Sequence, residues 1–101
     1  MRCVTIGVLA IVSFRCRDTE KLFRRERVKR FRNIEAVARG KLEELEWLEK
    51  LDDLRVPPGN RLEALAGDRV GQHRIRINDQ FRTCFVRTAQ GAINVEIVDY
   101  H

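Results

Sequence analysis

The sequence ends in Val98-Asp99-Tyr100-His101, which places a carboxylate, a phenol and an imidazole in three successive residues. All three groups can exchange protons, and histidine is the one that ordinarily titrates near neutral pH. They follow an apparent β-strand, in which alternate side chains point to opposite faces. Asp99 and His101 would then share one face, so Tyr100 can meet the same substrate only if the chain twists. A solvated tail is the alternative interpretation.

A second chemical signal is the distribution of positive charge. Residues 13–41 carry eleven basic and four acidic side chains, and residues 55–88 carry seven arginines and three acidic side chains. Residues 42–54 between them are acidic, with six acidic residues and one lysine. Guanidinium groups make forked contacts with phosphate, so the two basic segments could meet and form a phosphate-binding groove. A generally basic surface is the alternative.

The composition limits the class of protein. A chain of 101 residues with 44% hydrophobic residues is expected to fold as one soluble domain, and its net charge of +5 is typical of nucleic-acid-binding proteins. The cysteines at 3, 16 and 84 contain no C-x-x-C pair, which indicates neither a disulfide framework nor a zinc site. The apolar run 3–12 is too short to span a bilayer and suits a first β-strand. These features favour a cytoplasmic protein without membrane contact.

Two helices are predicted to follow this strand. Asp18 is a good N-cap for the first helix, and a break is expected near Glu26. The second and longer helix should bury one stripe, with apolar residues at steps of three and four. Its members are Val28, Phe31, Ile34, Ala38, Leu42, Leu45 and Leu48. The basic residues Lys29, Arg30, Arg32, Arg39 and Lys41 fall on the other faces and would be available to solvent or a polyanion.

The remaining sequence predicts strands. Prolines 57 and 58 end the helical region, and the hydrophobic period then changes from near 3.6 to 2. A short strand is expected at 61–65 and a turn at 66–69. Two further strands should meet in a hairpin at Asn78-Asp79, and the last strand should place Ile93, Val95 and Ile97 on one face. The predicted fold class is α+β, with helices packed on one face of a mainly antiparallel sheet.

Several segments together carry a family resemblance. They are SFRCRDTEKLF, VKRFRNIEAVARGKL, LDDLRVPPGNRLEALAGDRVGQHRIRINDQFRTCFVR and the terminal VEIVDYH. In this order and spacing they resemble the HigB-type toxins of the RelE superfamily, in the group described as plasmid maintenance killer proteins. The resemblance covers residues 11–101 as one toxin domain and implies a RelE-like fold, with two N-terminal helices on a small sheet. Residues 1–10 would be an N-terminal extension, a misassigned start or part of the first strand.

The resemblance also implies an activity and partners. Such a protein would be a cytoplasmic mRNA endonuclease that acts on the ribosome, inhibits translation and needs neither metal nor cofactor. A HigA-type helix-turn-helix antitoxin would neutralise it, and the two proteins together would bind operator DNA. The alternative is a catalytically weak relative that mainly binds its antitoxin and tunes repression of the operon.

Residue roles carry over at matching positions. The resemblance assigns Arg82 to the substrate phosphate, Asp99 and His101 to acid–base catalysis, and Tyr100 to base stacking or proton donation. The candidate RNA contacts are Arg61, Arg69, Arg74 and Arg76. His73 alternates with isoleucines and is expected to belong to a packed face rather than to the site. The chain also departs from the family pattern, with Glu63, Ala66, Val70 and Phe81 where relatives commonly carry His, Lys, Lys and Trp.

Overall fold

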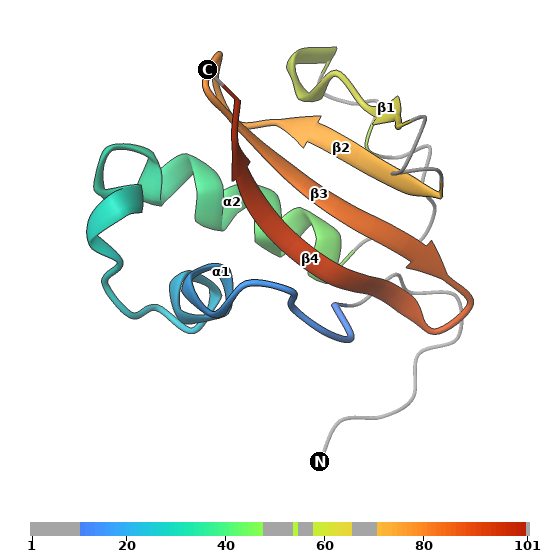
Figure 1. The fold of residues 1–101 in the computed structure, drawn as a ribbon, viewed down its shortest axis with the longest axis horizontal. Helices are drawn as coiled ribbons and strands as arrows, with labels where there is room; N and C mark the ends of the chain where they lie inside the picture. Colours follow the sequence, from blue (N-terminus) through green and yellow to red (C-terminus); the bar gives the residue numbers. More distant parts are fainter. Residues whose placement is uncertain (1–10, 48–53, 55–57, 66–70, 101) are drawn as a thin grey trace.

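A computed structural model describes residues 11–47, 54, 58–65 and 71–100. The elements follow one another as α1 (Arg17–Phe23), the 3₁₀ helix η1 (Lys29–Ile34), α2 (Glu35–Glu46), the 3₁₀ helix η3 (Pro58–Asn60), β1 (Glu63–Ala64), β2 (Gln72–Arg76), β3 (Phe81–Thr88) and β4 (Gly91–Asp99). The four strands pair antiparallel in the order β1-β2-β3-β4 (Figure 1). The predicted α+β class is therefore confirmed.

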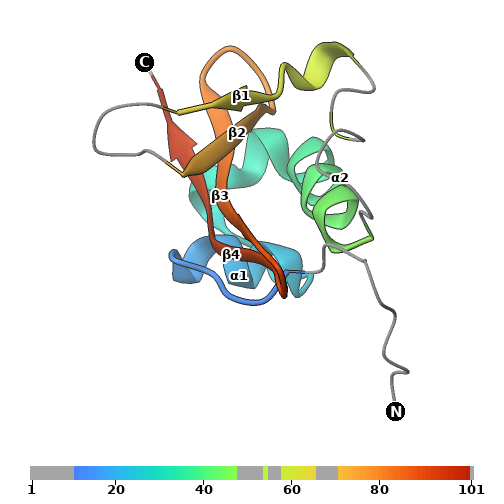
Figure 2. The ribbon, with the colours of Figure 1, turned by 90° about the vertical axis from the view of Figure 1, so that its right-hand side faces the viewer.

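Both α-helices lie on the same side of the sheet (Figures 1 and 2). We call this side of the sheet the inner face. It contributes fully buried Ile75, Phe85 and Val95 to a core shared with the helices. The opposite side, the outer face, presents the alternate residues of the same strands. The core thus fixes which strand side chains point away from the helices.

The predicted stripe of the second helix is confirmed over its described residues. Val28, Phe31, Ile34, Ala38, Leu42 and Leu45 are all at most 7% exposed, whereas Leu48 lies outside the described residues. The stripe does not belong to one continuous α-helix, because residues 29–34 form the 3₁₀ helix η1. A step of three places Phe31 and Ile34 on one side of a 3₁₀ helix. Gly40 lies within α2 and does not end it.

The start of α1 differs from the sequence prediction. Cys16 occupies the N-cap position, and Asp18 lies inside the first turn. The position of Thr19 explains this difference. Its buried hydroxyl oxygen accepts a hydrogen bond from the backbone N–H of Ile97 at 2.9 Å, which fixes α1 against β4. Asp18 instead forms an ion pair with Arg30 at 3.3 Å.

The described part of the predicted first strand runs parallel to β4. Ile11 and Phe14 form isolated parallel bridges with Ala92 and Val95, and residues 1–10 lie outside the described residues. Ser13 accepts the N–H of Val95 through its backbone oxygen at 3.1 Å. These contacts, with the Thr19 hydroxyl, cover the open edge of β4 and occupy its hydrogen-bonding groups.

A bulge in β4 overturns one predicted face. The register changes between the pairs Cys84↔Glu96 and Val86↔Ile93, and Asn94 adopts a left-handed conformation with φ of 55°. Ile93 therefore pairs with outward-facing Val86 and does not share the inner face with Val95 and Ile97. An extra residue in a strand reverses the alternation of side chains beyond it. Ala92 fills the inner face in place of Ile93 and is fully buried.

The predicted hairpin at Asn78-Asp79 is confirmed, and it brings the end of β4 to the same place. The side-chain oxygen of Asn78 accepts the backbone N–H groups of Gln80 and Phe81, at 2.9 and 2.7 Å. Tyr100 donates its backbone N–H to the carbonyl of Gln80 at 2.6 Å. The β2–β3 turn and the end of β4 thus lie side by side (Figure 1).

The first strand of the sheet is shorter than predicted. Regular pairing is limited to Glu63–Ala64, and the backbone N–H of Leu65 extends it with one hydrogen bond to Gln72 at 2.9 Å. The predicted turn at 66–69 lies outside the described residues. Fully buried Asn60 anchors the start of this strand, since its amide donates to the Leu54 carbonyl at 3.1 Å and to Glu44 on α2 at 3.0 Å.

Candidate functional site

Three arginines project from the outer face of the sheet. Arg74 and Arg76 alternate with buried Ile75 on β2, and Arg82 precedes buried Thr83 on β3. Arg76 and Arg82 are direct cross-strand partners. We call Arg74, Arg76, Arg82 and the adjoining Tyr100 the arginine face. Like charges placed directly opposite repel one another, so this arrangement costs stability unless each guanidinium finds an acceptor.

Arg82 finds its acceptors in the backbone of the β2–β3 turn. Its Nη1 donates to the carbonyl oxygen of Asn78 and, at 3.1 Å, to that of Phe81. These contacts draw the partly buried guanidinium toward the turn and occupy a single nitrogen. A guanidinium has five N–H donors, so Arg82 keeps donors for a bound anion.

Arg76 pairs with Asp79 in the same turn, at an N–O distance of 2.5 Å. The hydrogen bond from Arg76 and the charge of Arg76 lower the pKa of Asp79, and Arg82 and Arg61 add smaller contributions of the same sign. Arg61 therefore also lies within electrostatic range of this turn. Three of the candidate arginines thus act electrostatically on one exposed carboxylate, and Arg76 is the one that pairs with it.

Arg74 lies between Tyr100 and Glu63. Its guanidinium carbon is 5.0 Å from the centre of the Tyr100 ring, and its ion pair with Glu63 measures 3.3 Å. Hydrogen bonds to Tyr100 and to Glu63 raise the pKa of Arg74. The Tyr100 hydroxyl lies 3.8 Å from the sulfur of Cys84, which is 1% exposed although it points to the outer face. Tyr100 therefore folds back over the sheet.

The structure separates Asp99 from Tyr100. Asp99 pairs in register with Phe81, whose ring packs edge-on against Phe31 at 6.0 Å and so belongs to the helix side. The side-chain amide of Gln80 donates to both carboxylate oxygens of Asp99, at 3.1 and 3.2 Å. The strand alternation expected for these residues therefore persists to the end of β4. His101 and Arg69 lie outside the described residues.

His73 lies on the inner face, as the alternation of β2 predicts. Its ring stacks on Phe85 with centroids 6.0 Å apart, and its buried Nδ1 has no hydrogen-bond partner among the described residues. Burial lowers the pKa of His73, and the positive charge of Arg87 lowers it further. The prediction that His73 belongs to a packed face is confirmed.

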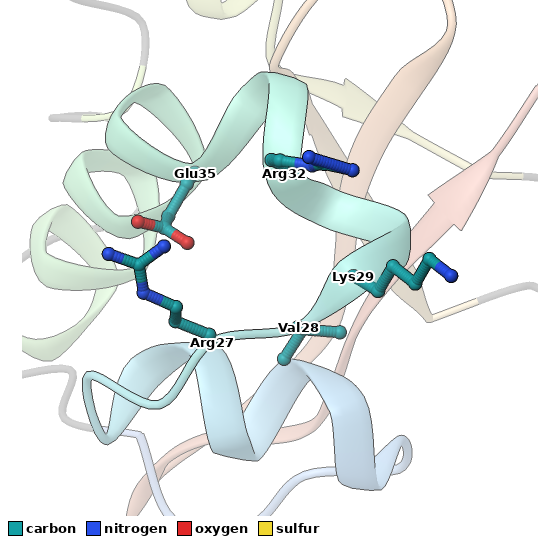
Figure 3. A pocket seen from close by; sticks show the side chains of 5 residues that line it. All are labelled: Arg27, Val28, Lys29, Arg32 and Glu35. Carbon is teal, nitrogen blue, oxygen red and sulfur yellow. The ribbon is translucent and has the colours of Figure 1, made fainter.

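The helix side carries a second basic surface. A cavity of about 290 Å³ is lined by Arg27, Val28, Lys29, Arg32 and Glu35, and we call it the helix-side cavity. Figure 3 shows the side chains of Arg27 and Glu35 turned toward each other, while Lys29 and Arg32 extend the other way. The lining of this cavity includes no residue of the arginine face.

Two basic residues predicted to be available on this helix are structural. The Nε of Arg39 donates to the Leu22 carbonyl at 2.9 Å, and its other nitrogens contact the Glu26 carbonyl and Glu35 at 3.0 Å. Lys41 donates to the side-chain oxygen of buried Asn60. Both side chains are at most 16% exposed. The prediction that they are available to a polyanion was wrong, because they bind groups at the ends of neighbouring segments.

The sequence interpretation missed the acceptors that hold the arginines. Asn78 was read only as part of a turn, although its backbone carbonyl accepts a hydrogen bond from Arg82. Gln80, whose side-chain amide donates to Asp99, was not considered. Glu63 was read as a lost histidine, although it pairs across strands with Arg74. Knowledge of the β1–β2 register would have revealed this contact, because directly opposed side chains on one face meet.

The described residues contain no group of three or more His, Cys, Asp or Glu side chains arranged to hold a metal ion. No helix in the described ranges combines the length and apolar composition that crossing a bilayer requires. Neither Cys16 nor Cys84 forms a disulfide.

The helices and the four-stranded antiparallel sheet form an α+β domain that is consistent with the RelE-like fold implied by the sequence resemblance. The model of a family described as the RelE-like toxin of the type II toxin-antitoxin system HigB matches residues 13–101. The chain therefore belongs to the HigB family of RelE-like toxins. A curated relative, Toxin HigB-1 of Vibrio cholerae serotype O1 (strain ATCC 39315 / El Tor Inaba N16961), is 45% identical over 53 residues. That match covers 52% of this chain and 56% of the relative.

Proposed function

We propose that this protein is the toxin of a type II toxin-antitoxin pair and cleaves mRNA on the ribosome. The observation that carries the proposal is the arginine face, where three guanidinium groups and a phenol ring share one open side of the sheet. Arginine provides forked donors for phosphate, and aromatic rings stack on unpaired bases. A single-stranded RNA can therefore be bound by both its backbone and a base.

The proposed reaction uses the 2′-hydroxyl of the RNA itself. Its oxygen attacks the adjacent phosphorus and loses its proton, the bond from phosphorus to the 5′-oxygen breaks, and that oxygen takes up a proton. The products are a 2′,3′-cyclic phosphate and a 5′-hydroxyl. The pentavalent intermediate gains negative charge, which Arg82 stabilises with help from Arg76. Arg61, Arg69 and Arg74 are proposed to bind the neighbouring backbone.

Proton transfer is assigned to the last three residues. Tyr100 stacks on a base or donates a proton to the leaving oxygen, and His101 and Asp99 are the acid–base pair. Asp99 lies on the opposite side of β4 from Tyr100 and is bound by Gln80. Its role in the proposed reaction therefore requires the end of β4 to move when RNA binds.

The proposed partners follow from the family. A type II toxin has a protein antitoxin, and we propose a HigA-type helix-turn-helix protein that neutralises this chain in the cytoplasm and carries it to operator DNA. One observation favours a weaker enzyme that acts mainly as a co-repressor. Glu63 neutralises part of the positive charge at Arg74, where a family histidine would not.

The test is cleavage of a defined mRNA by the purified protein, with and without translating ribosomes. Cut positions are mapped by primer extension, and the chemistry of the new ends is determined. The proposal expects cleavage that depends on the ribosome and leaves a 2′,3′-cyclic phosphate. If the protein binds a neighbouring helix-turn-helix product but cleaves nothing on ribosomes, the co-repressor function replaces the enzyme.

Site assignments are tested in the same assay with Arg82→Ala and with deletion of His101. Arg24→Ala is the control, because Arg24 is an exposed arginine at the end of α1 that pairs with Glu20 at 3.0 Å and does not belong to the arginine face. Full activity in both site variants would reject the assignment of Arg82 and His101.

A further inference from the structure

Glu63 and Arg74 are direct cross-strand partners on β1 and β2. The Nε and Nη2 of Arg74 donate to the two carboxylate oxygens of Glu63, each at 3.3 Å. Two parallel donors on one carboxylate define the plane of the guanidinium as well as its position. Glu63 therefore fixes Arg74 from the β1 side of the sheet.

Tyr100 fixes the same guanidinium from β4. The guanidinium carbon of Arg74 lies 5.0 Å from the ring centre, within the range of a cation–π contact. The far end of the ring is held in turn, since the Tyr100 hydroxyl lies 3.8 Å from the sulfur of buried Cys84. Arg74 thus lies between a carboxylate and an aromatic ring that come from opposite edges of the sheet.

We infer that Glu63 is a positioning residue of the RNA-cleaving site, which holds Arg74 over Tyr100 so that a substrate phosphate meets an oriented guanidinium. The inference rests on the proposed function. The contact with Glu63 engages Nε and Nη2, and because a guanidinium has five N–H donors, donors remain for a phosphate oxygen. The residue that replaces the family histidine thus has a role through Arg74.

Folding stability alone does not account for this arrangement. The side chains of Arg74 and Glu63 are 25% and 51% exposed, and exposed ion pairs typically contribute about 0–1 kcal/mol. A matched pair exists on the helix side, where Arg30 and Asp18 are also 3.3 Å apart and are 56% and 40% exposed. Asp18→Ala removes an equivalent carboxylate away from the site and is the control.

The kinetic test uses ribosome-dependent cleavage. We expect Glu63→Ala to raise KM about tenfold with kcat nearly unchanged, because a displaced guanidinium weakens a contact with the neighbouring RNA backbone that is made equally in the ground state and the transition state. Glu63→Gln keeps one acceptor oxygen for Arg74 and should reverse part of the increase in KM. If Glu63 only repels RNA, its removal lowers KM and leaves kcat unchanged, and the inference is wrong.

A double-mutant cycle tests whether Glu63 acts through Arg74. If it does, Glu63→Ala/Arg74→Ala cleaves as slowly as Arg74→Ala alone, because the second change removes a support that no longer has a function. Two losses that multiply would show that Glu63 acts independently, for example as a proton acceptor, and would overturn the positioning role.

A spectroscopic readout separates this inference from the proposed function. Tyr100 is the single tyrosine of the chain, so 3-fluorotyrosine labelling gives one ¹⁹F signal at the site. Glu63→Ala should shift that signal as Arg74 moves from the ring, and Asp18→Ala should not. Failure of the wild type to cleave rejects the proposed function, whereas an unmoved signal in Glu63→Ala rejects the inference.

Discussion

The two basic surfaces of this protein use their charges differently. On the arginine face, a turn carbonyl, Asp79 and Glu63 each fix one guanidinium. At the helix-side cavity, Lys29 and Arg32 form no ion pair with any described residue, and Glu35 contributes a carboxylate to the lining. One surface consists of oriented donors, whereas the other consists of long, exposed side chains.

This difference shows why the number of charges does not identify a site. The helical segment is the more basic of the two in sequence, yet Arg39 and Lys41 are used to join segments of the fold. An exposed lysine or arginine loses side-chain entropy when it orders around a ligand, whereas a guanidinium already held by the protein has lost it in folding. Phosphate should therefore bind preferentially to the arginine face.

Arg82→Ala is expected to have the largest effect on this comparison. Removing a preorganised donor to a developing negative charge typically costs about 100-fold or more in kcat. We expect a loss of that size in ribosome-dependent cleavage, measured as the initial rate of formation of the cut mRNA. The free energy of unfolding is measured in the same variant, so that loss of the Arg82 contacts with the turn carbonyls is separated from loss of cleavage.

Arg82→Lys provides the control, because it keeps one positive charge without the forked donors. It should remain far below the wild type. Recovery of most of the activity by lysine would mean that the arginine face acts through charge alone, and the comparison with the helix-side cavity would lose its basis.

Arg39→Ala should produce the next largest effect, on stability rather than on cleavage. Arg39 joins the end of α1 to α2 through the carbonyls of Leu22 and Glu26 and through Glu35. Hydrogen bonds from a charged donor contribute about 1.5–3 kcal/mol, so we expect a loss of about 2 kcal/mol in urea unfolding. Lys29→Ala should cost less than about 0.5 kcal/mol. Equal losses in the two variants would show that Arg39 is also dispensable surface charge.

Sequence patterns predicted the structure correctly where one hydrophobic period or one turn motif determined it. The helical stripe from Val28 to Leu45 and the hairpin at Asn78-Asp79 follow from local rules of period and turn chemistry. The start of α1 and the face of Ile93 do not, because the Thr19 hydroxyl accepts from Ile97 and the backbone N–H of left-handed Asn94 donates to the Ser13 hydroxyl, and both partners are distant in sequence.

The candidate site was predicted in its residue types more than in its arrangement. The family pattern pointed to Arg74, Arg76, Arg82 and Tyr100, and the structure brings these onto one face. The family pattern could not indicate that Glu63 binds Arg74, since predicting that contact requires the register of β1 and β2. Nor could the sequence pattern distinguish Arg39, which holds α1 and α2 together, from an arginine that is available to RNA.

The two faces of β2 should also differ in their response to pH. His73 on the inner face has a pKa lowered from 6.5 by burial and by Arg87, so the unfolded chain binds a proton more readily than the folded chain. Stability is therefore complete above pH 6.5 and should fall as the pH decreases below it. His73→Gln should reduce this dependence in unfolding measured between pH 8 and pH 5. An unchanged pH profile in that variant would assign the effect to other groups.

The smallest effect is expected from Lys29→Gln/Arg32→Gln, which removes two positive charges at the helix-side cavity while keeping side chains of similar length. Both residues lack ion pairs with the described residues and extend away from Glu35 (Figure 3). Their contribution to RNA binding should be limited to screened, long-range attraction, which is weak beyond a Debye length of about 8 Å at physiological salt. Cleavage on ribosomes at that salt should therefore change less than about threefold, a free-energy change below about 0.7 kcal/mol.

The variant should differ more from the wild type at low salt, because screening is then reduced. A loss as large as that of Arg82→Ala would show that unfixed charge on the helix side is as important as the oriented guanidinium groups of the sheet.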